Sequence, residues 1–233
     1  MPAKSKTGEL NGRALAKHRK RFLRFFPRAF KDQRYIDWEV TYKMTAHDLW
    51  VELLNEDDYK ALLRSRDYQE IANRALRVEA KTNFLFSFEK MALRDGVKSR
   101  EGARIFSEGL FQLLHERGPL KERFVQWIVS VGELPRVKSR VLSWPVLTLF
   151  PFIAQPSKHI IMKPTAMINA ASELGYDLDY SSKPNFGTYE RLLHLSQVIK
   201  KEIADLKPKD HMDTQAFLWV IGSSEYEHLS PED

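Results

Sequence analysis

The chain has 233 residues, 43% of them hydrophobic and 29% charged, which is typical of a folded protein with a sizeable core and excludes a disordered or collagen-like chain. It contains no cysteine, which excludes disulfides, thiolate metal sites and cysteine nucleophiles. The net charge is +6, and its distribution along the chain is uneven.

Positive charge is concentrated at the N-terminus. Residues 1–34 contain eleven lysines and arginines against Glu9 and Asp32, a net charge of +9, whereas the rest of the chain carries −3. A basic segment on a mildly acidic body favours an anionic partner, and a solvated charged surface is the alternative. The first ten residues contain no apolar segment, so we expect no secretory signal. We expect residues 1–12 to form a flexible tail.

Residues 13–26 are predicted to form the first helix, which Pro27 ends or kinks. The next segment, IDWEVTYKM (36–44), alternates apolar and polar residues, the pattern of a β-strand. Helical periodicity then returns over 45–54, 56–64 and 67–82, where threonine or acidic residues stand at the predicted N-termini.

Further helices are predicted over 83–93, 99–117 and 119–131, before a polar segment, GELPRVKSR (132–140), that could divide the domain. The apolar stretch VLSWPVLTLFPFIA (141–154) has 14 residues. Because a bilayer span needs about 20, it is predicted to be a buried core segment, and no transmembrane segment is expected. Helices follow over 163–175, 188–206 and 210–222, with residues 227–233 as a tail.

These elements predict a mainly α fold. We expect a single multi-helix orthogonal bundle of about nine or ten helices, with a basic N-terminal helix and at most one small β element. One helical domain is expected to extend over residues 13–226, with a possible sub-boundary near 132–140.

Three stretches carry a resemblance to known sequences: residues 82–118, 158–180 and 210–223. Together they resemble a widespread family of uncharacterised bacterial proteins. The resemblance implies a bacterial origin and a mostly helical unit. It implies no activity, and no catalytic residue is carried over from it.

The strongest functional signal is HRKRFLRFFPRAF (18–30), which contains five cations and four phenylalanines. In a helix, one strip about 100° wide contains Arg13, Lys17, Lys20, Arg21 and Arg24, and the opposite side contains Leu15, Phe22, Phe25 and Phe26, with Arg19 the one cation out of place. Arg28 would extend the strip only if the helix continues through Pro27. Such a strip suits contact with phosphates. The candidate nucleic-acid-binding residues are Arg13, Lys17, Lys20, Arg21, Arg24 and Arg28.

Other interpretations of this helix remain open. It could be a docked helix with a solvated basic face, or it could lie on an anionic membrane surface. RALAKH also has the Arg-x4-His spacing of the helical HEPN ribonucleases. That resemblance would make His18 the proton-transfer group and Arg13 the phosphate stabiliser.

No cofactor or metal is predicted. The sequence contains no phosphate-binding glycine loop, Rossmann fingerprint or nucleophile elbow. No pair of histidines has metal-ligand spacing, and HMD (211–213) is interpreted as the capped start of a helix.

The sequence therefore predicts a cytoplasmic, non-enzymatic helical protein that binds DNA or RNA, or a nucleic-acid complex, through its basic N-terminal helix. A subunit that contacts other proteins is the first alternative, because an exposed patch could include some of five tryptophans, Trp38, Trp50, Trp127, Trp144 and Trp219. A HEPN-like ribonuclease is the second, so whether the protein is an enzyme stays open.

Overall fold

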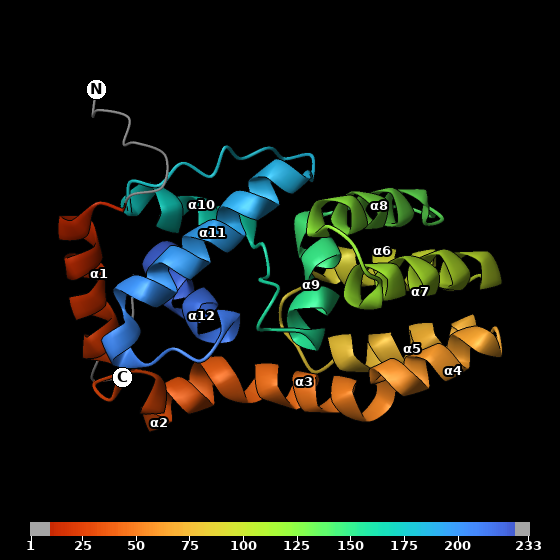
Figure 1. The fold of residues 1–233 in the computed structure, drawn as a ribbon, viewed down its shortest axis with the longest axis horizontal. Coiled ribbons are helices and arrows are strands. Elements are labelled where there is room, and N and C mark those ends of the chain that lie inside the picture. The colour runs from red at the N-terminus through yellow and green to blue at the C-terminus, as the bar shows by residue number, and fades with distance from the viewer. Residues whose placement is uncertain (1–9, 227–233) are drawn as a thin grey trace. The chain divides into compact units, whose positions relative to one another are not determined.

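The structure is a computed structural model that describes residues 10–226. Every regular element in this range is helical (Figure 1), which confirms the mainly α prediction. The predicted tails lie outside the described residues, except for residues 10–12, where Asn11 caps the first helix and Gly12 begins it.

The chain divides into two compact units. The first combines residues 10–41, 162–181 and 187–226, and the second combines residues 42–161 with 182–186. The predicted sub-boundary near 132–140 lies inside the second unit.

The first unit contains the N-terminal helix α1 (Gly12–Phe25), a short helix α2 (Gln33–Tyr35), α10 (Pro164–Glu173), almost all of α11 (Phe186–Glu202) and α12 (His211–Gly222). α10 and α12 pack closely side by side, and α1 packs against α12. An aromatic cluster forms the core beneath α1, where the Phe22 ring lies 5.1–6.0 Å from the rings of Phe26, Phe30, Tyr35 and Phe217.

The second unit contains nearly all of α3 (Thr41–Leu54), α4 (Glu56–Arg64), α5 (Tyr68–Glu79), α6 (Ser87–Gly96), α7 (Arg100–His115), α8 (Leu120–Glu133) and α9 (Trp144–Ala154). The predicted core segment is α9, whose residues 144–153 are all buried. The ring of Phe106 in α7 packs against the rings of Trp127 and Phe150. The Trp127 indole donates a hydrogen bond to the Leu147 carbonyl at 2.8 Å.

The strand predicted at residues 36–44 is wrong. Residues 33–54 form one continuous helix, in which a π-helical turn (Ile36–Val40) joins α2 to α3. With α2 and α3 counted as one helix, the described residues contain eleven α-helices rather than nine or ten.

The alternating pattern of residues 36–44 gave the wrong prediction because polar residues lie on the buried face of this helix. The buried positions of this helix are Tyr35, Glu39, Lys43, Ala46, Trp50 and Leu54, which repeat every three to four residues. Ile36, Trp38 and Met44, which made the pattern resemble a strand, are 36–38% exposed. Buried Glu39 is compensated by the Tyr226 hydroxyl, which donates to its carboxylate at 2.6 Å.

Candidate nucleic-acid interface

Helix α1 is fixed by a cap at its start and by an apolar face along its length. The Asn11 side chain accepts hydrogen bonds from the backbone N–H groups of Arg13 and Ala14, both at 3.1 Å, and the Asn11 N–H donates to the Leu174 carbonyl. Helix α1 ends at Phe25, two residues before Pro27. It is therefore held as a rigid element rather than a loose arm.

The aromatic residues of this segment belong to the core. Phe22 and Phe26 are fully buried, and Phe25 and Phe30 are at least 93% buried. Phe25 also packs its ring against Tyr226 at 5.1 Å. The expected separation of phenylalanines from cations is therefore present, and the four phenylalanines are not available to stack on nucleic-acid bases.

Four of the predicted residues form one exposed strip along α1. Arg13, Lys17, Lys20 and Arg24 repeat at intervals of four, three and four residues, which places them within about 60° of one another around the helix. All four are exposed. The strip extends about 16 Å along the axis, and we refer to these four residues below as the basic strip.

Within residues 10–226, most of the basic strip carries charge that no carboxylate compensates. No carboxylate in residues 10–226 forms an ion pair with Arg13, Lys20 or Arg24. Lys17 lies 3.8 Å from the Glu173 carboxylate, with its own side chain 73% exposed, so this contact is weak. The strip can thus accept anionic groups without first breaking a strong ion pair.

The remaining cations near α1 differ in their surroundings. Arg21 is half-buried and donates to the Tyr226 carbonyl at 2.9 Å. Arg28 lies beyond the end of α1 and is exposed. Arg19, which the helical projection places away from the others, forms a bidentate ion pair with Asp205. Arg21 and Arg19 therefore also serve to attach α1 to its own unit.

A polar pocket of about 270 Å³ lies beside the basic strip. Its lining comes from three helices of the first unit: α1, α10 and α12. The lining residues are Lys17, His18, Arg21, Asn169, Ser172, Glu173, Ile221 and Gly222. A hydrogen bond joins α10 and α12 at this pocket, where the Asn169 amide donates to the Gly222 carbonyl at 3.2 Å.

His18 is the buried member of this pocket, with 2% of its surface exposed. Its Nε2 lies 3.1 Å from the Glu173 carboxylate, and because a carboxylate only accepts, Nε2 carries the proton. Nδ1 is buried and has no hydrogen-bond partner among the described residues. Burial lowers the pKa of His18, and this outweighs the opposing influence of Glu173. At neutral pH the ring is therefore neutral and joins α1 to α10.

The structure does not bring Arg13 and His18 together. Five residues on a helix are separated by about 140°, and Arg13 is exposed whereas His18 is buried. Sequence reasoning also treated His18 only as part of a motif and missed its partner Glu173. A histidine on the apolar side of an amphipathic helix was the available signal, but nothing in the sequence identifies a carboxylate 155 positions away.

Residues 211–213 act as a helix start, as the sequence indicated. Asp210 caps α12 by accepting from the Met212 N–H at 2.7 Å. In the part of the chain that the structure describes, no three histidine, aspartate or glutamate side chains are grouped so as to hold a metal ion.

Comparison with known proteins adds no relative. The sequence matches no protein-family model, and no curated protein or solved structure is significantly similar to it. Among the described residues, no helix is both long enough and apolar enough to cross a membrane.

Proposed function

We propose that this protein binds nucleic acid through α1, with the basic strip in contact with backbone phosphates. The observation that supports the proposal is the alignment of Arg13, Lys17, Lys20 and Arg24 on one exposed face, three of them without a carboxylate partner in residues 10–226. Arg21 and Arg28 stand at the margins of this face and would add contacts to phosphates there.

Binding of this kind depends on the charge of the nucleic-acid backbone rather than on the base sequence. Phosphate contacts carry no direct sequence information, and the phenylalanines that could have stacked on bases are buried. We therefore infer that the protein binds DNA and RNA with little sequence preference and acts without catalysis.

Binding through four phosphates should depend strongly on salt. Each neutralised phosphate of duplex DNA contributes a slope of about −0.9 in log affinity against log salt, so four contacts weaken binding roughly 100-fold between 50 and 200 mM salt. The double variant Lys20→Gln/Arg24→Gln removes two contacts. It should bind more weakly at low salt and show about half the salt slope.

Titration of a fluorescent 20-base-pair duplex at several salt concentrations measures both quantities. The matched control is Lys201→Gln/Lys207→Gln, which removes two exposed charges elsewhere in the same unit and should leave the slope unchanged. Equal affinities and slopes for the two double variants would reject the basic strip as the interface.

A second candidate function, a subunit that contacts other proteins, has its own support in the second unit. Phe86 and Phe88 stack on each other with centroids 5.7 Å apart and planes 11° apart, and each is 59% exposed beside Met91, which is 54% exposed. By contrast, Trp50, Trp127 and Trp144 are buried, so these three tryptophans belong to the core and do not contribute to an exposed patch.

The substitution pair Phe88→Ser/Met91→Ser tests this candidate. A partner held at this surface should be retained by the unmodified chain in a pull-down from native lysate and lost with the double variant. Val51→Ser, at another exposed apolar position, is the control. Recovery of the same proteins with all three chains would contradict a docking role for Phe88 and Met91.

We infer, finally, that the protein works in the bacterial cytoplasm. The absence of cysteine suits a reducing compartment, and the resemblance of residues 82–118, 158–180 and 210–223 to bacterial sequences supports a bacterial origin. Nucleic acid is abundant in that compartment, which agrees with the proposed partner.

A further inference from the structure

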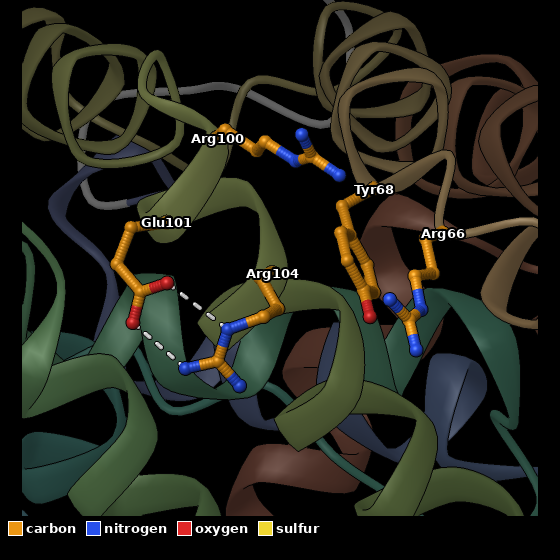
Figure 2. Close-up of a pocket in the computed structure, with 5 residues that line it drawn as sticks. All are labelled: Arg66, Tyr68, Arg100, Glu101 and Arg104. Carbon is orange, nitrogen blue, oxygen red and sulfur yellow. Dashed lines mark hydrogen bonds and ion pairs between the residues drawn. The ribbon is translucent and has the colours of Figure 1, made fainter.

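A second cationic site lies in the second unit, where a pocket of about 450 Å³ is lined by Arg66, Tyr68, Arg100, Glu101 and Arg104 (Figure 2). Arg66 and Tyr68 come from the turn between α4 and the start of α5, and the other three residues come from the first two turns of α7. A pocket of this volume is within the range that holds small ligands.

One guanidinium in this pocket is held rigidly. Arg104 donates from Nε and Nη2 to the two oxygens of Glu101, at 3.0 and 2.7 Å, and from Nη1 to Glu108 at 2.6 Å; Figure 2 shows the pair with Glu101. Three of its five N–H donors are thereby used, and two remain for a ligand. The fixed orientation lowers the entropy lost when an anion binds.

In the described residues, no carboxylate holds the guanidinium of Arg66 or Arg100 in this way. Both are exposed, and neither forms an ion pair with a carboxylate in the described part of the chain. Counting Glu101 and Glu108 against the three arginines leaves one net positive charge. The site therefore favours an anion, and more so an anion with several acceptor oxygens.

The backbone at Arg66 has a conformation that glycine usually adopts at the end of a helix. Helix α4 ends in a Schellman motif, in which the Arg66 N–H donates to the Leu63 carbonyl and the Asp67 N–H donates to the Leu62 carbonyl. The position after the cap has φ of 58°, a left-handed conformation that glycine usually occupies. Arginine is strained there, and strained residues cluster at binding sites.

Tyr68 adds an aromatic surface and a hydroxyl to the same pocket. Figure 2 shows its ring near Arg66. Desolvation and the neighbouring Glu108 raise the pKa of its hydroxyl, and Arg66 and Arg104 oppose this shift. A phosphate held by the arginines would therefore have a planar ring beside it, and an attached base or sugar could pack against that ring.

We propose that this pocket binds a phosphomonoester, with the phosphate oxygens accepting hydrogen bonds from Arg66, Arg100 and Arg104. Guanidinium groups match phosphate in geometry and remain charged at every physiological pH. The site belongs to a different unit from the basic strip, and the proposal does not rest on the nucleic-acid function.

Isothermal titration calorimetry of the full chain with inorganic phosphate, AMP and adenosine tests the proposal. AMP and phosphate should both bind, AMP more tightly if Tyr68 packs against the base, whereas adenosine should not. Absence of heat with AMP and phosphate up to about 1 mM, or equal binding of adenosine and AMP, would overturn it.

Arg66→Gly is the decisive variant because it removes the guanidinium while giving the left-handed position its preferred residue. Its melting temperature should be unchanged or higher, and its affinity for AMP should fall by about 10-fold or more, the loss expected for a charged hydrogen bond. Arg64→Ala, which removes an exposed arginine at the end of α4 outside the pocket, should bind AMP within about twofold of the original chain.

Unchanged affinity in both Arg66→Gly and Arg100→Ala would also overturn the proposal, because both variants remove guanidiniums that have no structural partner in the described residues. If Arg64→Ala weakened binding as much as Arg66→Gly, the effect would be general electrostatics rather than a defined site.

Discussion

At the scale of single residues, the first unit depends on buried polar side chains that are paired. The Tyr35 hydroxyl donates to one oxygen of Asp213 at 2.6 Å, and the Lys209 N–H donates to the other at 2.6 Å. Burial raises the pKa of Asp213 despite these bonds. Such groups are tolerated inside a protein because each donor meets an acceptor.

His211 makes the stability of this unit depend on pH. Burial, reinforced by Lys200 and opposed by Asp210, lowers the pKa of His211 to about 4, and its Nδ1 lies 2.7 Å from the Ser196 hydroxyl. In the unfolded chain the pKa is about 6.5. Between these values the unfolded state binds more protons, so the free energy of unfolding falls as pH decreases from 6.5 toward 4.

We predict that His211→Gln reduces this pH dependence. Between pH 7.5 and 5 the histidine accounts for a loss of about 2 kcal/mol, which the neutral amide does not incur. Thermal melts of both chains at pH 7.5, 6.5 and 5 measure the difference. His18 and His115, whose pKa values burial also lowers, act in the same direction in both chains. Parallel curves would contradict the assignment to His211.

At the scale of secondary-structure elements, small residues allow helices to approach closely. A Cβ atom added to Gly222 of α12 would lie 2.0 Å from the Ala166 carbonyl oxygen and 2.7 Å from the Ala170 nitrogen of α10. These are backbone atoms, so relief requires the two helices to separate. The contact between α10 and α12 therefore depends on glycine at this position.

We predict that Gly222→Ala destabilises the protein by about 1–3 kcal/mol, as overpacking does, and lowers the melting temperature by roughly 3–10 °C. Differential scanning fluorimetry measures the shift. Gly12→Ala is the control, because a Cβ there meets no atom within 4 Å and alanine favours a helix. Its melting temperature should stay the same or rise, and similar losses in both variants would contradict the packing explanation.

Helix α1 is an amphipathic element with a buried apolar face and an exposed basic face. Its apolar face joins the aromatic core through Phe22 and Phe25, while the basic strip remains on the surface. Removing cations from the strip should therefore change binding without unfolding the unit, which is the premise of the Lys20→Gln/Arg24→Gln experiment.

At the scale of the whole molecule, the charge is divided between distinct sites. The N-terminal excess of +9 over residues 1–34 is only partly available, because Arg19 is paired with Asp205 and Arg21 is bonded to the Tyr226 carbonyl. The pocket lined by Arg66, Arg100 and Arg104 belongs to the other unit. The proposed binding at the basic strip and the proposed binding at the pocket are therefore separable by mutation.

The limits of sequence reasoning are clearest in residues 33–54. Apolar alternation there predicted a strand because local patterns assume that apolar residues face inward. The buried face instead carries Glu39 and Lys43, and the Glu39 carboxylate is satisfied by a tyrosine 187 positions away. A local pattern cannot reveal a partner so distant in the sequence. The helical period of these residues was therefore mistaken for the two-residue period of a strand.

The sequence by itself determined the helical class, most helix positions and the separation of cations from phenylalanines along α1, because these follow from interactions within a few residues of each other. Only the tertiary structure decided which cations are neutralised, that His18 pairs with Glu173, and that Arg66, Arg100 and Arg104 share a pocket. Those contacts join residues far apart in the chain, and their formation depends on packing that local periodicity does not encode.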